Sequence, residues 1–218
     1  QAVARQLAAA TQAMRQRAES LEFRLTKASV EIEGLRSKVD EISQEARTDA
    51  LTSLANRKHF DDRLTDAVET GAPLCVIMGD VDHFKKFNDT WGHQTGDQVL
   101  RLVGSCFREN VKGRDTAARY GGEEFAVILP ETTLANARML AEQIRKAVQS
   151  KKVVKRSSGE TLGSITISLG VATLRPGDTA EELVRRADSC LYTAKRSGRN
   201  MVVSDEQLTI VRGSASAA

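Results

Sequence analysis

Cysteine, proline and aromatic residues are scarce in this chain of 218 residues, which has three cysteines, three prolines and 4% aromatic residues. The cysteines are widely spaced in apolar runs or helical faces, so they predict small buried side chains rather than a disulfide framework or a zinc site. The longest apolar runs, such as Leu74–Met78, are far too short to cross a bilayer, and no signal-peptide pattern opens the chain. We therefore expect a cytoplasmic protein with no membrane segment in this chain.

An excess of charge of one sign is also lacking. The 32 basic residues are spread among 29 acidic ones, and no basic stripe interleaved with aromatic residues is present, so we expect no nucleic-acid partner. A composition of 40% hydrophobic and 28% charged residues is typical of a soluble globular chain, long enough for one domain plus an extension. The first residue is Gln1 rather than Met, which leaves room for an upstream part, such as a sensor domain, that has been removed.

Residues 1–47 contain no proline and carry mostly apolar residues at two positions of a seven-residue repeat. One position is occupied by Leu7, Met14, Leu21, Ala28, Leu35 and Ile42, and the other by Ala4, Thr11, Ala18, Leu25, Ile32, Val39 and Ala46. This repeat predicts a coiled coil, whereas a helix packed on its own domain favours a period nearer 3.6 residues. Arg17 and Glu22 occupy a g position and the following e position. Glu31 and Arg36 repeat this relation with reversed signs, as expected in a parallel, in-register homodimer.

After this repeat, apolar runs and amphipathic segments alternate. We expect helices near residues 58–68, 83–88, 95–111, 134–148 and 179–196, and strands near 74–78, 125–129, 165–171 and 201–203. Strands alternating with helices around one hairpin predict an α/β (α+β) sandwich of ferredoxin-like character. The expected organisation is a parallel dimeric coiled coil over 1–47, one domain over 48–205 and a flexible C-terminal tail over 206–218.

The segment Arg119–Phe125 predicts a β-hairpin with Gly121 and Gly122 as its turn. Glu123 and Glu124 would then open the returning strand, where alternation sends their side chains to opposite faces. One carboxylate would face a ligand beside a bare glycine backbone.

Asp80 and Asp82 follow the apolar strand at residues 74–78, at the end where ligands commonly bind open α/β sheets. With the two glutamates of the hairpin they offer hard oxygen ligands that suit Mg²⁺. The pattern alone is weak, and each pair by itself favours a structural role, because Asp82 would suit capping of the following helix and paired glutamates at a strand start are often merely exposed. Both interpretations stay open on these residues.

Gly-Gly-Glu-Glu-Phe at Gly121–Phe125 resembles the signature of the GGDEF family, the diguanylate cyclases, in its form with Glu for Asp. The resemblance continues in the family's order over roughly residues 48 to 203. The other matching blocks are Asp49–Arg57, Asp80–Lys85, Asn88–His93, Gly96–Asp97, Ala187–Asp188, Leu191–Tyr192, Ala194–Lys195 and Gly198–Asn200.

The resemblance implies a palm-like cyclase fold in which two domains, each holding one GTP, face each other and form cyclic di-GMP with release of two pyrophosphates. Two Mg²⁺ or Mn²⁺ ions per active site are implied as cofactors. The carboxylate of Asp80 and the backbone carbonyl of Val81 would bind metal. Glu123 and Glu124 would lie at the metals, one of them as a ligand, with Glu123 also the candidate base for the attacking 3′-hydroxyl.

The resemblance also implies how the substrate is held. Gly121 and Gly122 would let the backbone approach the nucleotide. Asn88 and Asp97 would contact the guanine, and Lys85, Lys195 and Arg199 would hold the phosphates. A carboxylate accepts two N–H donors from the guanine edge that adenine does not offer in that arrangement, which favours GTP over ATP.

One departure from the family pattern concerns the inhibitory product site, Arg-x-x-Asp, which here is Lys112-Gly-Arg-Asp115. An ammonium group does not reproduce the bidentate fork of a guanidinium or its stacking on a guanine. Gln143 also stands where a secondary arginine is often found, and Arg114 would need a different reach. We therefore expect weak or absent feedback inhibition at this degenerate site.

Three interpretations of the function remain. In the first, the chain is an active cyclase whose coiled coil brings two half-sites together and sets whether they face each other. In the second, it is a catalytically silent GGDEF domain that binds nucleotide or cyclic di-GMP, although the chain keeps every metal and guanine position of the family. In the third, the coiled coil is a scaffold and the domain is incidental.

Overall fold

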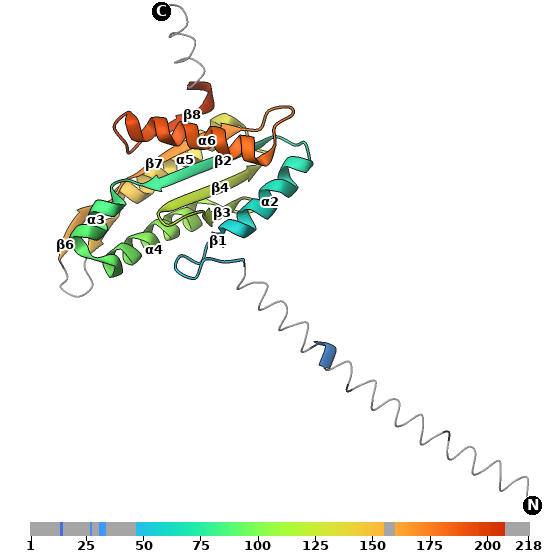
Figure 1. The fold of residues 1–218 in the computed structure, drawn as a ribbon, viewed down its shortest axis with the longest axis horizontal. Helices are drawn as coiled ribbons and strands as arrows, with labels where there is room; N and C mark the ends of the chain where they lie inside the picture. The colour runs from blue at the N-terminus through green and yellow to red at the C-terminus, as the bar shows by residue number, and fades with distance from the viewer. Residues whose placement is uncertain (1–13, 15–26, 28–30, 34–46, 155–159, 208–218) are drawn as a thin grey trace, which may run out of the picture. The chain divides into compact units, whose positions relative to one another are not determined.

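The computed structural model separates the chain into two units, residues 1–46 and 47–218. It describes residues 14, 27, 31–33, 47–154 and 160–207. Most of the coiled coil expected over residues 1–47 and most of the tail expected from residue 206 therefore lie outside the described residues, and both stay predictions. The fold below is that of the second unit (Figure 1).

A six-stranded sheet in the order β1-β3-β4-β2-β7-β8 forms the centre of this unit. Its strands are β1 (Ala55–Asn56), β2 (Leu74–Val81), β3 (Thr116–Arg119), β4 (Glu124–Pro130), β7 (Ile167–Thr173) and β8 (Val202–Ser204). The inner strands β3, β4, β2 and β7 are antiparallel in the order of a ferredoxin-like sheet, and the edge strands β1 and β8 pair in parallel with β3 and β7. The α/β, ferredoxin-like prediction is confirmed.

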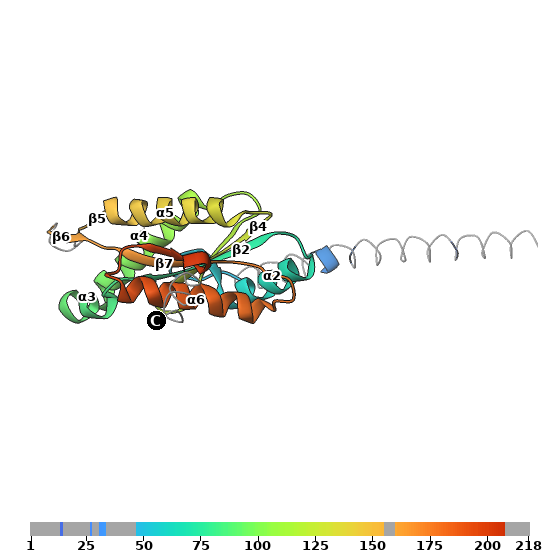
Figure 2. The same ribbon diagram turned by 90° about the horizontal axis from the view of Figure 1, so that it is seen from above.

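Helices cover both faces of the sheet (Figure 2). They are α2 (Arg57–Glu69), α3 (Phe84–Trp91), α4 (His93–Asn110), α5 (Leu134–Ser150) and α6 (Ala180–Arg196). One core joins α4 and α5 to side chains such as Ile77, and the other joins α2 and α6 to side chains such as Met78. Successive residues of β2 thus point into opposite cores, as strand alternation requires. None of the described helices is long and apolar enough to cross a membrane.

Two helix starts show how the local sequence places these elements. Asn56 caps α2 by accepting a hydrogen bond from the His59 N–H. At α6, Thr179 and Glu182 form a reciprocal capping box. The five predicted helices are confirmed, with ends shifted by a few residues.

The polar segment between α5 and β7 departs from expectation. Strands β5 (Lys152–Val154) and β6 (Thr161–Ser164) pair there as a separate two-stranded sheet. These strands are largely exposed and have only three and four residues, which is too short for their alternation to be recognised in a sequence.

The connection between β3 and β4 corrects the predicted two-residue turn. β3 ends at Arg119 and β4 begins at Glu124, so Tyr120–Glu123 all lie in the connection. The N–H groups of Tyr120 and Gly121 both donate to the Glu124 carbonyl, at 2.9 and 3.2 Å. These hydrogen bonds join the start of the connection to the first residue of β4. Glu123 is therefore a loop residue, and only Glu124 opens the strand.

Candidate active site

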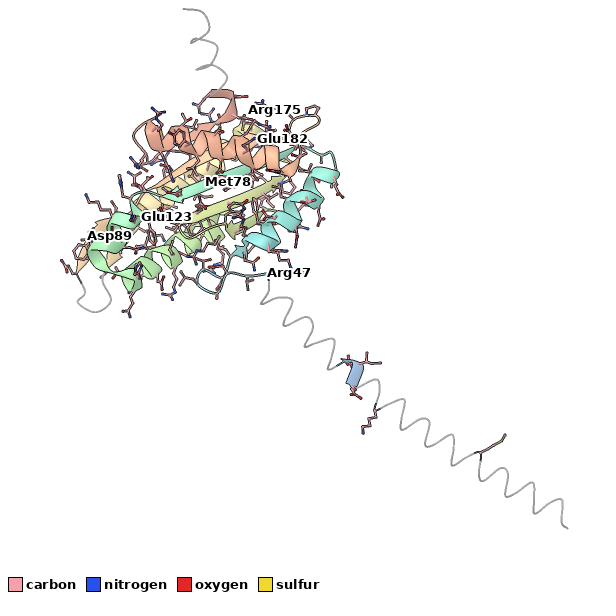
Figure 3. All side chains as sticks on the ribbon, viewed as in Figure 1. Arg47, Met78, Asp89, Glu123, Arg175 and Glu182 are labelled. Atoms are coloured by element: carbon pink, nitrogen blue, oxygen red, sulfur yellow. The ribbon has the colours of Figure 1, made fainter. Side chains whose placement is uncertain are left out.

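The carboxylates singled out from the sequence meet at one end of the sheet. Asp80 near the end of β2 is the register partner of Glu124 at the start of β4. The Val81 N–H donates to the Glu123 carbonyl at 3.2 Å, which extends this pairing into the loop. Figure 3 shows Glu123 at the end of the domain where α3 lies. Strand pairing thus brings two acidic segments, more than forty residues apart in the sequence, to one place.

Burial and like charge act together on this carboxylate cluster. Asp80 is only 5% exposed, and burial raises its pKa, with further increases from the charges of Glu124 and Asp82. The ammonium of Lys195 lies 2.7 Å from the Asp80 carboxylate and opposes this increase. The pKa of Glu123 is also raised, first by burial and then by the charge of Asp80. Such a cluster favours the binding of cations or protons.

The donor set fits a divalent metal such as Mg²⁺, because its groups are carboxylates and one strand carbonyl and their mutual repulsion falls when a cation is bound. The fit is not that of a preformed cage. Within the described ranges, no group of three or more His, Cys, Asp or Glu side chains is gathered closely enough to hold a metal ion. The ammonium of Lys195 contacts the Asp80 carboxylate and neutralises its charge directly.

Gly121 makes room for Glu124. A Cβ atom at residue 121 would collide with the carboxylate of Glu124 and would lie 3.3 Å from its Cβ. A Cβ at Gly122 would meet nothing within 4 Å. Neither glycine has a positive φ, so the backbone conformation requires glycine at neither position, and the close approach of the Glu124 side chain is what favours glycine at residue 121.

Asn88 lies on α3, which packs against α4, the helix that carries Asp97. The side chain of Asn88 fills the space that Gly96 leaves open, where a Cβ would collide with the Asn88 amide oxygen. That oxygen is buried and has no hydrogen-bond partner within the described part of the chain. A buried polar atom without a partner is costly, and an added donor would satisfy it. Both residues predicted to contact guanine, Asn88 and Asp97, are half-buried.

The three residues predicted to hold phosphates lie at two helix ends. Lys85 is exposed on the first turn of α3, whereas Lys195 is on the last turn of α6. Arg199 is exposed in the turn after α6, with φ at 65°. Of the three, Lys195 is the one that the structure places against the carboxylates.

Asp82 has a structural role, but not the helix cap that was one of its two possible roles. The residue before α3 is His83, whose side chain makes no capping hydrogen bond. Asp82 is 4% exposed and accepts hydrogen bonds from the hydroxyls of Thr166 and Ser168, both at 2.7 Å, and from the Asn200 N–H at 3.0 Å. The carboxylate thus fastens the turn after α6 to β2 and β7. The Asp-x-Asp spacing alone gave no sign of which aspartate has these partners.

A second interaction missed from the sequence ties the start of the domain to the Gly-Gly loop. Arg119 contacts Asp49 at 3.1 Å and donates to the Gly122 carbonyl at 2.8 and 3.2 Å. Burial raises the pKa of Asp49, but hydrogen bonds from Thr52 and then the charge of Arg119 outweigh burial and hold it below its usual value. Both residues stand in the quoted family blocks or beside them, yet their pairing depends on the fold.

Lys112 and Asp115 flank the loop that leads into β3. Lys112 is exposed and Asp115 is half-buried, with burial raising the pKa of its carboxyl. The neighbouring Arg114 contacts Glu131 at 2.7 Å, and both side chains of that pair are largely exposed. Gln143 is exposed on α5.

A groove of about 450 Å³ runs beside α3, against β6 and the start of β7. Asp82, Lys86 and Trp91 are among its lining residues, and none of the predicted nucleotide contacts is. The carboxylate cluster, rather than this groove, combines the charges expected of a nucleotide site.

Comparison with known families identifies this domain. The family described as "Diguanylate cyclase, GGDEF domain" matches residues 46–201. The chain belongs to the GGDEF family. The resemblance recognised in the Gly-Gly-Glu-Glu-Phe segment is therefore confirmed, and the GGDEF domain covers most of the chain.

Individual relatives agree with this assignment. The chain is 39% identical over 201 residues to the diguanylate cyclase VdcA of Vibrio cholerae, and 45% identical over 174 residues to the response regulator PleD of Caulobacter vibrioides. These matches cover 92% and 78% of this chain, but it spans only 59% and 38% of the two relatives.

A solved structure resembles the chain over a larger share of both proteins. The coiled coil and GGDEF domain of DgcB from Caulobacter crescentus, crystallised in complex with c-di-GMP, superposes with a TM-score of 0.81 at 46% identity. The match covers 85% of this chain and 99% of that one. The GGDEF domain of this chain therefore has the fold of a cyclase-family domain that occurs beside a coiled coil in a relative.

Proposed function

We propose that this chain is a diguanylate cyclase that condenses two GTP molecules into cyclic di-GMP and two pyrophosphates. The observation that carries the proposal is the paired placement of Asp80 and Glu124, with Lys195 at 2.7 Å from Asp80, in a domain of the GGDEF family. Relatives 39 to 42% identical to this chain are named diguanylate cyclases.

The carboxylate end of the sheet supplies the metal ligands in this proposal. Two Mg²⁺ or Mn²⁺ ions, when bound, would lower the pKa of the attacking 3′-hydroxyl and offset negative charge on the α-phosphoryl group. Asp80, Glu124 and the Val81 carbonyl would hold them. Glu123 has a raised pKa, which makes its carboxylate a better proton acceptor for the 3′-hydroxyl.

The substrate would lie across the loop and the two helices. Gly121 and Gly122 leave the backbone bare on one side, and Lys85, Lys195 and Arg199 would neutralise the triphosphate. The guanine would reach Asn88 and Asp97. The Asn88 oxygen and the Asp97 carboxylate would accept hydrogen bonds from N–H groups of the guanine edge. Adenine does not offer two N–H donors in that arrangement, so the site would select GTP over ATP.

One test of the activity compares the unaltered protein with Glu123→Gln, an isosteric change that removes the proposed base. Each is incubated with GTP and Mg²⁺, and cyclic di-GMP is measured by chromatography. We expect product from the unaltered protein and a loss of about 10²-fold or more in the variant. Nucleotide binding without turnover would instead indicate a receptor domain, and neither binding nor turnover would indicate a scaffold.

The coiled coil would bring the second half-site, on the GGDEF domain of a partner chain, close to the first. Each domain would hold one GTP, so a parallel homodimer raises the effective concentration of the partner domain. Light scattering at tens of micromolar is expected to give the mass of a dimer, and Leu21→Asp with Leu35→Asp is expected to give a monomer. A monomeric unaltered protein with full turnover would contradict this part of the proposal.

A further inference from the structure

The turn between α6 and β8 has an unusual backbone. Gly198, Arg199 and Asn200 are consecutive residues with φ of 120°, 65° and 46°. Positive φ suits glycine, whereas a side chain with a Cβ atom disfavours it. Two adjacent non-glycine residues keep such a conformation where surrounding contacts hold it.

Contacts from three elements hold this turn. The Arg199 N–H donates to the Ala194 carbonyl at 3.0 Å, which closes the end of α6. The Asn200 N–H donates to the buried Asp82 carboxylate at 3.0 Å, which anchors the turn beside β2. The Asn200 side-chain oxygen accepts a hydrogen bond from the Arg145 guanidinium of α5 at 2.7 Å. Asn200 is thus held through its backbone from one side and through its side chain from another.

Arg145 is itself held in place before it reaches Asn200. Glu142 receives two hydrogen bonds from it, at 2.7 and 2.8 Å, in a bidentate arrangement. Gln149 receives a third, at 2.8 Å. The Arg145 side chain is only 12% exposed. Its fourth hydrogen bond, to a residue 55 positions away, is the one that joins α5 to the turn.

We infer that Arg145 is a positioning residue for GTP binding: through Asn200 it fixes the turn that presents Arg199 to the substrate phosphates. The inference rests on the proposed function, because Arg199 is assigned to the phosphates there. Arg145 touches no substrate in this scheme. Its guanidinium fixes the side chain of Asn200 while Asp82, two residues after Asp80, fixes the backbone, so the turn and the carboxylate cluster share one support.

The decisive variant is Arg145→Met, which keeps a long side chain and removes every hydrogen bond. The KM for GTP is expected to rise about tenfold with kcat little changed, as for loss of one hydrogen bond to a charged group that acts on substrate binding. Arg145→Lys is expected to restore only part of the affinity, because an ammonium lacks the fork that engages Glu142. The matched control is Lys146→Met, the next residue of α5, whose side chain is 69% exposed.

A double-mutant cycle distinguishes positioning from general stability. If Arg145 acts through Arg199, Arg145→Met has no further effect on KM once Arg199→Ala is present. Additive effects of the two changes, or a fall in kcat alone, would overturn the inference.

Hydrogen–deuterium exchange of the unligated protein gives a readout without turnover. Exchange of the Asn200 amide is expected to be faster in Arg145→Met and unchanged in Lys146→Met. Unchanged exchange in Arg145→Met would overturn the inference whatever the activity. Absence of cyclic di-GMP synthesis by the unaltered protein would overturn the proposed function instead, so the two failures are told apart.

Discussion

Arg119 joins Asp49 across 70 residues of sequence, with 3.1 Å between its guanidinium and the carboxylate, while two of its nitrogens donate to the Gly122 carbonyl. Asp49 is the third residue of the second unit of the chain. A single side chain therefore connects the start of the GGDEF domain to the loop that carries Glu123.

We expect Arg119→Lys to lower kcat about tenfold. Lysine keeps the charge but does not reproduce the hydrogen bonds to Gly122 and Asp49 at the same time, so the loop loses its fixed position. The free energy of unfolding should fall by about 1 kcal/mol, because the pair with Asp49 is partly buried. Steady-state kinetics and thermal melting measure the two effects.

The matched control is Arg114→Lys. Arg114 contacts Glu131 at a shorter distance, 2.7 Å, but both side chains are more than half exposed. Exposed pairs contribute little, so this variant should keep its kcat and melting temperature. Equal losses in the two variants would argue against a specific role of Arg119.

Gly96→Ala should weaken guanine recognition while leaving the domain folded. The added methyl group would occupy the space of the Asn88 amide oxygen and displace that side chain. We expect the KM for GTP to rise at least about tenfold. Alanine favours the helix by up to about 1 kcal/mol, which offsets crowding against Phe84, so the melting temperature should change little. Gln94→Ala, an exposed substitution two residues earlier, should leave GTP binding unaltered.

The sequence predicted the helices and strands whose apolar residues form a long run or recur at regular spacing. The continuous apolar run at Leu74–Met78 indicated a buried strand, and helical periodicity located α4, α5 and α6 within a few residues. Burial on a helix or strand face leaves a periodic trace in the sequence. β1 and the β5–β6 pair leave none, because they are only two to four residues long.

The candidate site was predictable in composition but not in its connections. Asp80 and the two glutamates could be identified as a ligand set, and strand register then placed Glu124 opposite Asp80. The hydrogen bond from the Asn200 N–H to the Asp82 carboxylate joins residues 118 positions apart. It depends on how three elements pack, and single residues in a sequence do not specify such pairing. Lys195 was assigned to phosphate from the resemblance, whereas the structure shows its contact with Asp80.

Metal binding should weaken as the pH falls. Burial and neighbouring charges raise the pKa of Asp80 and of Glu123, so protons compete with metal at a higher pH than for ordinary carboxyl groups. The apparent Kd for Mn²⁺ should rise as the pH is lowered from about 7.5 through the raised pKa values, by up to tenfold for each proton displaced per pH unit. Calorimetry across this range measures it.

The same shifts give the sign of the effect on stability. A carboxyl group with a raised pKa in the folded state contributes stability at low pH that is lost as the pH rises through that pKa. Glu123→Gln should therefore raise the melting temperature of the metal-free protein near neutral pH and make Mn²⁺ binding less dependent on pH. A variant with lower stability and the same pH dependence would contradict a titrating Glu123.

Lys112→Arg should strengthen binding of cyclic di-GMP about tenfold. Arginine would restore the fork that engages the product, beside the half-buried Asp115, whereas Lys112 is an exposed point charge and Arg114 is occupied by Glu131. Calorimetry of the unaltered protein should show weak binding, and initial rates should be little inhibited by added product. Asp115→Ala in the Lys112→Arg background should remove the gain, since the fork then has no acidic partner beside it. Low-micromolar binding by the unaltered protein that is lost in Asp115→Ala would show instead that lysine suffices for feedback inhibition.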